Sequence, residues 1–69
     1  MTRLKELREY HDLTQAECAK ASYISVKSYT RYEAGTRILP LDTAMYLAKL
    51  FDVSIDYIAG LTEDRRKYW

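Results

Sequence analysis

The feature that most constrains the fold is a link of only three residues, "SYI" at 22–24, between two segments that both read as helices. The first segment, residues 14–21, starts with "TQAE", a capping box in which Thr14 and Glu17 can satisfy each other's backbone N–H groups. The second segment, residues 25–34, begins at a serine suited to the N-cap position and stops before a glycine. So short a link forces the two helices to meet at a sharp angle and in close contact.

Close packing of two helices requires small side chains on the surfaces that face each other. In the first helix Cys18 and Ala19 share one face with Ser22, and all three side chains are small. Ile24 is expected to turn inward and fill the junction between the helices. Cys18 is the only cysteine of the chain, and we interpret it as a small buried hydrophobic residue rather than a reactive thiol.

Capping signals and apolar periodicity predict three further helices. Ser54 is suited to cap a helix that Gly60 terminates, and residues 42–51 place one apolar stripe along a helix. The start of the latter helix is ambiguous, because Pro40 and Asp42 both give entry signals. The predicted helices are 2–11, 14–21, 25–34, 42–51 and 54–59.

No segment alternates polar and apolar residues for long enough to be a convincing strand. We therefore expect an all-α fold: a compact five-helix domain over residues 1–61, followed by a C-terminal tail over 62–69. A single unpaired cysteine suits a reducing cytoplasm. No apolar run approaches the ~20 residues that span a membrane, and residues 1–10 lack the apolar stretch of a signal peptide. We expect a cytoplasmic protein that does not enter a membrane.

Charge is distributed unevenly, although the whole chain has a net charge of only +1. Residues 20–37 carry a net charge of +3 (Lys20, Lys27, Arg31 and Arg37 against Glu33). Residues 38–64 carry −4 (Lys49 against Asp42, Asp52, Asp56, Glu63 and Asp64). The basic stretch contains the second helix of the close pair, and a local positive face of this kind can bind a polyanion. The alternative is a chance cluster of solvated charges.

The helix predicted over 25–34 sorts its side chains onto two sides. On a helical wheel, one mixed set falls within an arc of about 140°: Val26, Lys27, Thr30 and Arg31. Tyr29 and Tyr32 fall on the opposite side. We expect the two tyrosines to anchor the helix in the core, which leaves the mixed set exposed to a partner.

The segment "LTQAECAKASYISVKSYTRYEAGTR", Leu13 to Arg37, resembles the helix-turn-helix of Cro/CI-type, lambda-repressor-like DNA-binding domains, the XRE family. The resemblance continues through "LDTAMYLAKLFDVSIDYIAGL" and covers residues 2–61. Its most specific pieces are "LTQ-E--A" at 13–19, "IS" at 24–25 and "RYE-G--R" at 31–37. The resemblance implies a five-helix lambda-repressor-like domain that binds double-stranded DNA.

Four positions depart from the family pattern. Tyr23 stands in the turn where the family has glycine, and a left-handed conformation there costs a non-glycine residue roughly 1 kcal/mol. Cys18 and Ser22 stand where the family has leucine, and Tyr29 where it has an aliphatic residue. The larger Tyr29 can fill the space that the two smaller residues leave, provided that its hydroxyl finds a partner or reaches water.

The resemblance implies that helix 25–34 lies in the major groove, where its N-terminal half meets base edges. Arg31 can form a bidentate pair with guanine, worth about 1–3 kcal/mol of discrimination. Lys27 can do the same or hold a phosphate, while Val26 offers methyl groups to thymine and Thr30 a methyl or a hydroxyl. The expected base-contacting residues are Val26, Lys27, Thr30 and Arg31.

Phosphate contacts are expected around this helix. Gln15 begins the preceding helix, where backbone N–H groups favour an anion, and Thr36 and Arg37 follow the reading helix. By resemblance, Arg8 in the first helix pairs with Glu33 and is oriented towards a phosphate; the alternative is two independent surface charges. The expected phosphate-contacting residues are Arg8, Gln15, Ser25, Ser28, Thr36 and Arg37.

Domains of this kind usually bind DNA as dimers on half-sites ~34 Å apart. The self-association surface is expected among C-terminal apolar residues that the core stripe does not obviously need: Leu39, Pro40, Tyr46, Leu50, Ile55 and Tyr57. The alternative is that several of them pack internally. The tail "TEDRRKYW" has three open roles, as a solvated tail, a phosphate-touching arm or a dimer contact through Trp69.

The function predicted from these features is a sequence-specific transcriptional regulator, with repression as the expected outcome, that binds a palindromic operator as a homodimer. The alternative is an antitoxin-like or adaptor module that binds another protein through the same fold. We do not expect an enzyme or a small-molecule substrate, because His11 and Cys18 are the only nucleophile–base candidates of the usual kind. One histidine and one cysteine do not make a zinc site, and we expect no cofactor.

Overall fold

The structure, a computed structural model, describes residues 2–61. Its helices are α1 (Leu4–Tyr10), α2 (Gln15–Ala21), α3 (Val26–Ala34), α4 (Leu41–Phe51) and α5 (Ile55–Ile58). The all-α, five-helix prediction is confirmed for this part of the chain: the ends at residues 21, 34 and 51 are as predicted, and the other helix ends differ from the predicted ones by one or two residues. The predicted tail over 62–69 lies outside the described residues.

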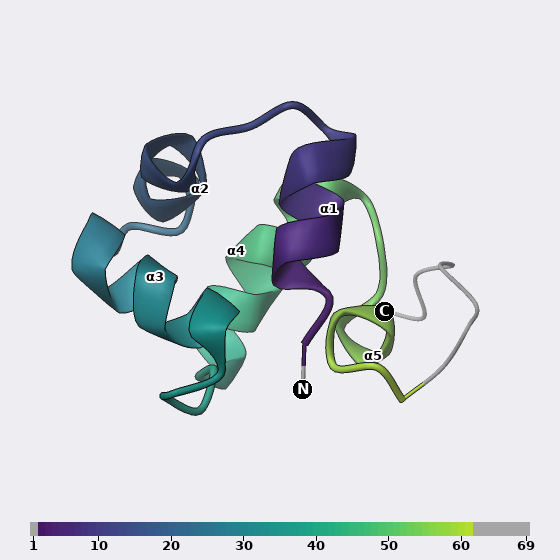
Figure 1. The fold of residues 1–69 in the computed structure, drawn as a ribbon. Coiled ribbons are helices and arrows are strands. Elements are labelled where there is room, and N and C mark those ends of the chain that lie inside the picture. The colour runs from purple at the N-terminus through teal and green to yellow at the C-terminus, as the bar shows by residue number, and fades with distance from the viewer. Residues whose placement is uncertain (1, 62–69) are drawn as a thin grey trace.

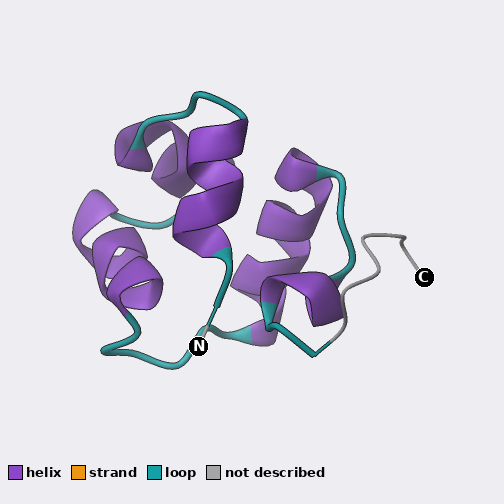
Figure 2. Ribbon diagram, turned by 45° about the vertical axis from the view of Figure 1, so that its right-hand side comes forward, coloured by secondary structure: helices purple, strands orange, loops and turns teal. Residues whose placement is uncertain are grey.

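The helices pack around one another rather than in a layer. In Figure 1, α2 and α3 lie on the left, α4 lies between α3 and α1, and α5 lies on the right beside the start of α1; Figure 2 shows α4 next to α5. α2 packs closely against α3 and also contacts α4, so that the pair rests on the rest of the domain. Within residues 2–61, none of the helices has the length and hydrophobicity of a membrane span.

The link between α2 and α3 is a helix stop followed at once by a helix start. The Tyr23 N–H donates to the Lys20 carbonyl at 3.2 Å and the Ile24 N–H donates to the Ala19 carbonyl at 3.0 Å, the two bonds of a Schellman motif. Tyr23 adopts the left-handed conformation, with φ of +61°. The structure therefore places a tyrosine at the strained position that the family resemblance assigns to glycine.

The predicted caps are confirmed. Thr14 and Glu17 form the complete capping box of α2, and Gly35 ends α3 with φ of +80°. Ser54 caps α5 through the Tyr57 N–H. The ambiguity at α4 is resolved, because the helix begins at Leu41 with Pro40 as its N-cap.

One hydrophobic core joins all five helices. It receives the small residues of α2 and the two tyrosines of α3, as predicted. The buried core residues are Leu4, Leu7, Cys18, Ala19, Tyr29, Tyr32, Leu47, Ala48, Phe51, Val53 and Ile58. Ile24 is partly buried and packs against this core, so it fills the junction between α2 and α3 as expected.

Candidate nucleic-acid interface

α3 presents one buried face and one exposed face. Tyr29 is fully buried and Tyr32 is 7% exposed, whereas Val26 on the other face is 46% exposed. Lys27 is exposed and Arg31 is half-buried. Among the described residues, neither the Lys27 ammonium nor the Arg31 guanidinium has a hydrogen-bond or ion-pair partner. α3 therefore holds two uncommitted cations on the side that the core does not occupy.

The hydroxyl of Thr30, a predicted base contact, is already used inside the domain. Thr30 Oγ1 donates either to the Val26 carbonyl at 2.8 Å or to Gln15 Oε1 at 3.0 Å. A single hydroxyl has only one proton to donate. What Thr30 can still offer a base is its methyl group and its acceptor lone pairs.

Two serines at the start of α3 divide their roles. Ser25 Oγ accepts the Ser28 N–H at 3.1 Å, which caps the helix, and lies 3.1 Å from Ser28 Oγ, to which it donates. Ser28 thereby keeps its own hydroxyl proton for an external acceptor. Ser28 is thus the better placed of the two to donate to a phosphate.

Thr36 braces the end of α3. Both its N–H and its hydroxyl donate to the Arg31 carbonyl, at 3.0 and 3.2 Å. Its two donors are therefore occupied, which leaves exposed Arg37 as the stronger phosphate candidate in this loop.

The predicted pairing of Arg8 with Glu33 is confirmed and ties α1 to α3. Arg8 Nε lies 2.9 Å from Glu33 Oε2, and Arg8 Nη2 lies 3.0 Å from Oε1. Arg8 Nη1 donates to the Leu13 carbonyl at 3.1 Å. Three of the five guanidinium N–H groups are thus bonded within the domain, so at most two remain for the predicted phosphate contact.

The polar groups around Glu33 fix its charge. Burial alone would raise the pKa of Glu33, but hydrogen bonds from Arg8 and from Gln15 Nε2 help to bring that pKa below its usual value. The same carboxylate raises the pKa of Arg8, chiefly through their hydrogen bonds. Both groups are therefore charged at neutral pH.

Tyr29 places its hydroxyl in the core beside this ion pair. The oxygen is fully buried and makes no hydrogen bond of ordinary distance and angle with a described residue. Burial, with the nearby Cys18 thiol and Glu33 carboxylate, strongly raises the pKa of the phenol. The same burial raises the pKa of Cys18, which agrees with its interpretation as an inert core residue.

Side chains of α1, α2 and α3 enclose a shallow recess of about 330 Å³ beside the exposed face of α3. Its lining residues, which we call the basic recess, are Lys5, Arg8, Gln15, Thr30, Glu33 and Ala34. Lys5 was not among the residues predicted from the sequence. The available signal was its position one helical turn before Arg8, which places both on one side of α1.

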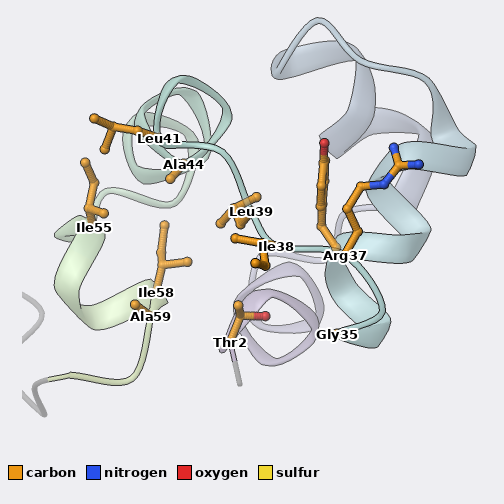
Figure 3. Close-up of a pocket in the computed structure, with 11 residues that line it drawn as sticks. Thr2, Gly35, Arg37, Ile38, Leu39, Leu41, Ala44, Ile55, Ile58 and Ala59 are labelled. Carbon is orange, nitrogen blue, oxygen red and sulfur yellow. The ribbon is translucent and has the colours of Figure 1, made fainter.

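A second, apolar groove of about 430 Å³ runs between the loop after α3 and helices α4 and α5. Figure 3 shows Ile38 and Leu39 from the loop on one side, and side chains of α4 and α5 on the other. We define the apolar groove by Ile38, Leu39, Leu41, Ala44, Ile55 and Ile58. Arg37 also lines the groove, and its guanidinium group points away from these apolar side chains (Figure 3).

Of the six residues predicted for self-association, some pack against the core and others are exposed. Four of the six pack partly buried against the core: Leu39, Leu50, Ile55 and Tyr57. Pro40 and Tyr46 are exposed.

The most exposed apolar side chains of the loop after α3 and of α4 were not predicted, namely Ile38 at 91%, Leu41 at 67% and Met45 at 48%. Leu41 and Met45 are four residues apart on the flank of α4 next to its buried stripe, and a helical wheel would have shown that they widen the apolar face of this helix.

Comparison with known proteins agrees with this architecture. Residues 4–58 match a helix-turn-helix family model. The chain is 48% identical over 62 residues to the uncharacterised HTH-type transcriptional regulator YobD of Bacillus subtilis, covering 90% of this chain and 55% of that protein. It is 37% identical over 65 residues to the HTH-type transcriptional regulator ImmR of the same species, covering 94% and 51%.

A third relative is named an antitoxin rather than a transcriptional regulator. Antitoxin PezA of Streptococcus pneumoniae is 40% identical over 57 residues, which cover 83% of this chain and 36% of that protein. The chain thus spans about half the length, or less, of these relatives. No solved structure gave a significant match. The match over most of its length, together with the paired helices α2 and α3, shows that this chain belongs to the Cro/CI-type, XRE family of helix-turn-helix domains, a family of DNA-binding transcription regulators.

Proposed function

We propose that this domain regulates transcription by binding double-stranded DNA, with α3 in the major groove. The observation that carries the proposal is the pair of uncommitted cations on α3, Lys27 and Arg31, opposite two tyrosines buried in the core. An α-helix fits the major groove, and Arg or Lys can pair with guanine O6 and N7 there. Val26 and the methyl of Thr30 supply apolar contacts to thymine.

Phosphate contacts flank the reading helix in this proposal. Arg37 and Ser28 have donors that no described residue uses. Arg8 and Gln15 each retain part of their hydrogen-bonding capacity, while Ser25 and Thr36 act first as braces of α3. Such contacts set the position of the protein on the duplex without reading its sequence.

In this proposal the domain binds a palindromic operator as a homodimer, because each copy contacts one half-site and the two-fold symmetry of the dimer matches that of the DNA. The apolar groove and neighbouring Met45 and Tyr46 supply the self-association surface in this proposal. The exposure of four apolar side chains supports it: Ile38, Leu41, Met45 and Tyr46. Repression is the expected outcome, because a bound dimer blocks access to the DNA that it covers.

One observation favours a second candidate function, that of an antitoxin-like or adaptor module. The relative PezA is named an antitoxin, and the exposed apolar groove of this chain can accommodate a partner protein as well as a second copy. In this case the groove binds the partner and DNA binding is secondary.

Selection of duplexes from a randomised pool, followed by a salt titration of the selected duplex, tests the proposal. DNA binding predicts an enriched sequence and a linear fall of log affinity with log salt concentration between ~50 and ~200 mM. If the chain enriches no sequence and binds no duplex at ~50 mM salt, the DNA-binding function is wrong and the partner-binding function is favoured.

A further inference from the structure

We infer that Lys5 supplies the net positive charge with which the basic recess, the proposed phosphate site of Arg8 and Gln15, holds the DNA backbone. The inference rests on the proposed DNA-binding function. The recess is formed jointly by α1, α2 and α3, through Lys5 and Arg8, Gln15, and Thr30 respectively.

The charges that line the recess give Lys5 its importance. Arg8 is committed to Glu33 by two hydrogen bonds of 2.9 and 3.0 Å, so these two charges offset each other. Lys5 is the remaining charged residue among those that line the recess. Without Lys5 the site would be neutral and would contain a carboxylate, which repels an anion.

Lys5 is also available to an external ligand. It is exposed and forms no ion pair or hydrogen bond with another described residue. Glu9 lies one turn further along α1, where it is a potential intrahelical partner, but the structure records no ion pair between the two. The ammonium therefore remains free to bind an anion in the recess.

Hydrogen-bond donors beside Lys5 complete the site. Thr30 can donate to Gln15 Oε1 at 3.0 Å, which orients the amide so that Gln15 Nε2 faces Glu33 Oε1 at 3.3 Å. One N–H of this amide and two of Arg8 remain unused by the bonds described above. A phosphate offers several acceptor oxygens and can use donors of this number at once.

The location of the recess suits DNA rather than a free anion. Thr30 and Ala34 on its rim belong to the exposed side of α3, next to the proposed base-reading residues. When a reading helix lies in the major groove, the helix before it crosses the DNA backbone. A phosphate beside α2 and the rim of α3 is therefore expected in that geometry.

The test measures the salt dependence of binding to a fluorescein-labelled selected duplex for the wild-type chain and three variants. Lys5→Gln removes the charge, Lys5→Arg keeps it, and Lys49→Gln removes an equal charge from α4, outside the recess. Each lost phosphate contact reduces the slope of log affinity against log salt by about 0.9 per bound protomer. We expect this reduction for Lys5→Gln alone.

The outcomes separate this inference from the function on which it rests. If wild type binds with a steep salt slope and Lys5→Gln has the same slope, the inference is wrong and the DNA-binding function stands. If Lys49→Gln reduces the slope as much as Lys5→Gln, the effect is one of net charge and the recess is again not the site. If wild type binds no duplex, both fail.

A second measurement distinguishes a DNA phosphate from a free one. The side-chain NMR signals of Lys5 and Gln15 are expected to shift on addition of the duplex but not on addition of inorganic phosphate at matched ionic strength. Equal shifts with inorganic phosphate alone would assign the recess to a free anion and overturn the inference.

Discussion

Arg8 and Glu33, which are 25 residues apart in sequence, form a bidentate ion pair that fastens α1 to α3. The side chains are only 16% and 6% exposed, so the pair is shielded from solvent more than a surface salt bridge. Gln15 of α2 donates to the same carboxylate. Three helices therefore share one charged group, and the orientation of α3 depends on it.

Glu33→Gln is predicted to lower the free energy of unfolding at pH 7 by about 2 kcal/mol, because it leaves the Arg8 guanidinium partly buried without its counter-ion. Urea denaturation measures this change. Lys49→Gln, an exposed neutralisation on α4, is the control and is expected to change stability by less than ~0.5 kcal/mol.

Glu33→Gln is also predicted to change how the stability of the fold depends on pH in the acid range. The pKa of Glu33 in the folded chain is lowered from an unfolded value of about 4.3. Its stabilisation is therefore fully present above pH ~4.3 and is lost as the pH falls through the lower folded-state pKa. Thermal unfolding from neutral pH to pH ~3 should show a shallower decline for Glu33→Gln than for wild type; an equal decline would contradict the lowered pKa.

Tyr29→Phe is predicted to preserve or raise stability, by up to about 1 kcal/mol, because it removes a buried hydroxyl that lacks a hydrogen bond of good geometry. The ring, which fills the core, is retained. Thermal denaturation measures the effect. A loss of ~1 kcal/mol or more would show that the hydroxyl has a strong partner, such as Glu33 or Cys18.

Tyr23 combines an unfavourable backbone conformation with a favourable contact of its aromatic ring. Its left-handed conformation costs roughly 1 kcal/mol, while its ring meets that of Tyr46 edge-on at a centroid distance of 4.9 Å. Tyr23→Ala loses the ring contact and keeps the backbone cost, whereas Tyr23→Gly loses both. We predict that the glycine variant is more stable than the alanine variant by about 1 kcal/mol in urea denaturation. Equal stability would mean that the left-handed turn is not strained.

Helix starts, helix ends and the orientation of α3 were predictable, because each depends on local chemistry. Ser25, Gly35 and the capping box act within a few residues of their own position, and the two tyrosines fall on one face by helical periodicity alone. The family pattern added the ion pair of Arg8 with Glu33, which no local rule gives.

Much of the candidate site depends on tertiary placement and was not predictable. The hydroxyl of Thr30 is shared with Gln15 on another helix, so its availability cannot be read from α3 by itself. Lys5 gains its proposed role only where α1 meets α2 and α3. Leu39 and Ile55 pack partly against the core, while Leu41 remains exposed, a division that depends on how the chain turns after α3.

Leu41→Glu is predicted to weaken self-association, because it places a charge in the most exposed part of α4 that lines the apolar groove. Sedimentation equilibrium of the free chain and of its complex with the selected duplex measures the change. Tyr10→Glu, which alters an exposed apolar residue outside the groove, is the matched control. If neither variant changes the mass of a dimeric wild type, the self-association surface lies elsewhere.

The assignment of α3 as the reading helix is tested most directly by the affinities of wild type, Arg31→Ala and Arg37→Ala for two duplexes, the selected one and a scrambled one of equal composition. At fixed salt concentration, Arg31→Ala is predicted to lose about 1–3 kcal/mol of discrimination between the two, roughly 5- to 150-fold in the affinity ratio. Arg37→Ala should weaken both duplexes alike and leave the ratio unchanged. An Arg31→Ala chain that keeps both its affinity and its preference would contradict the assignment of α3 as the helix that reads DNA.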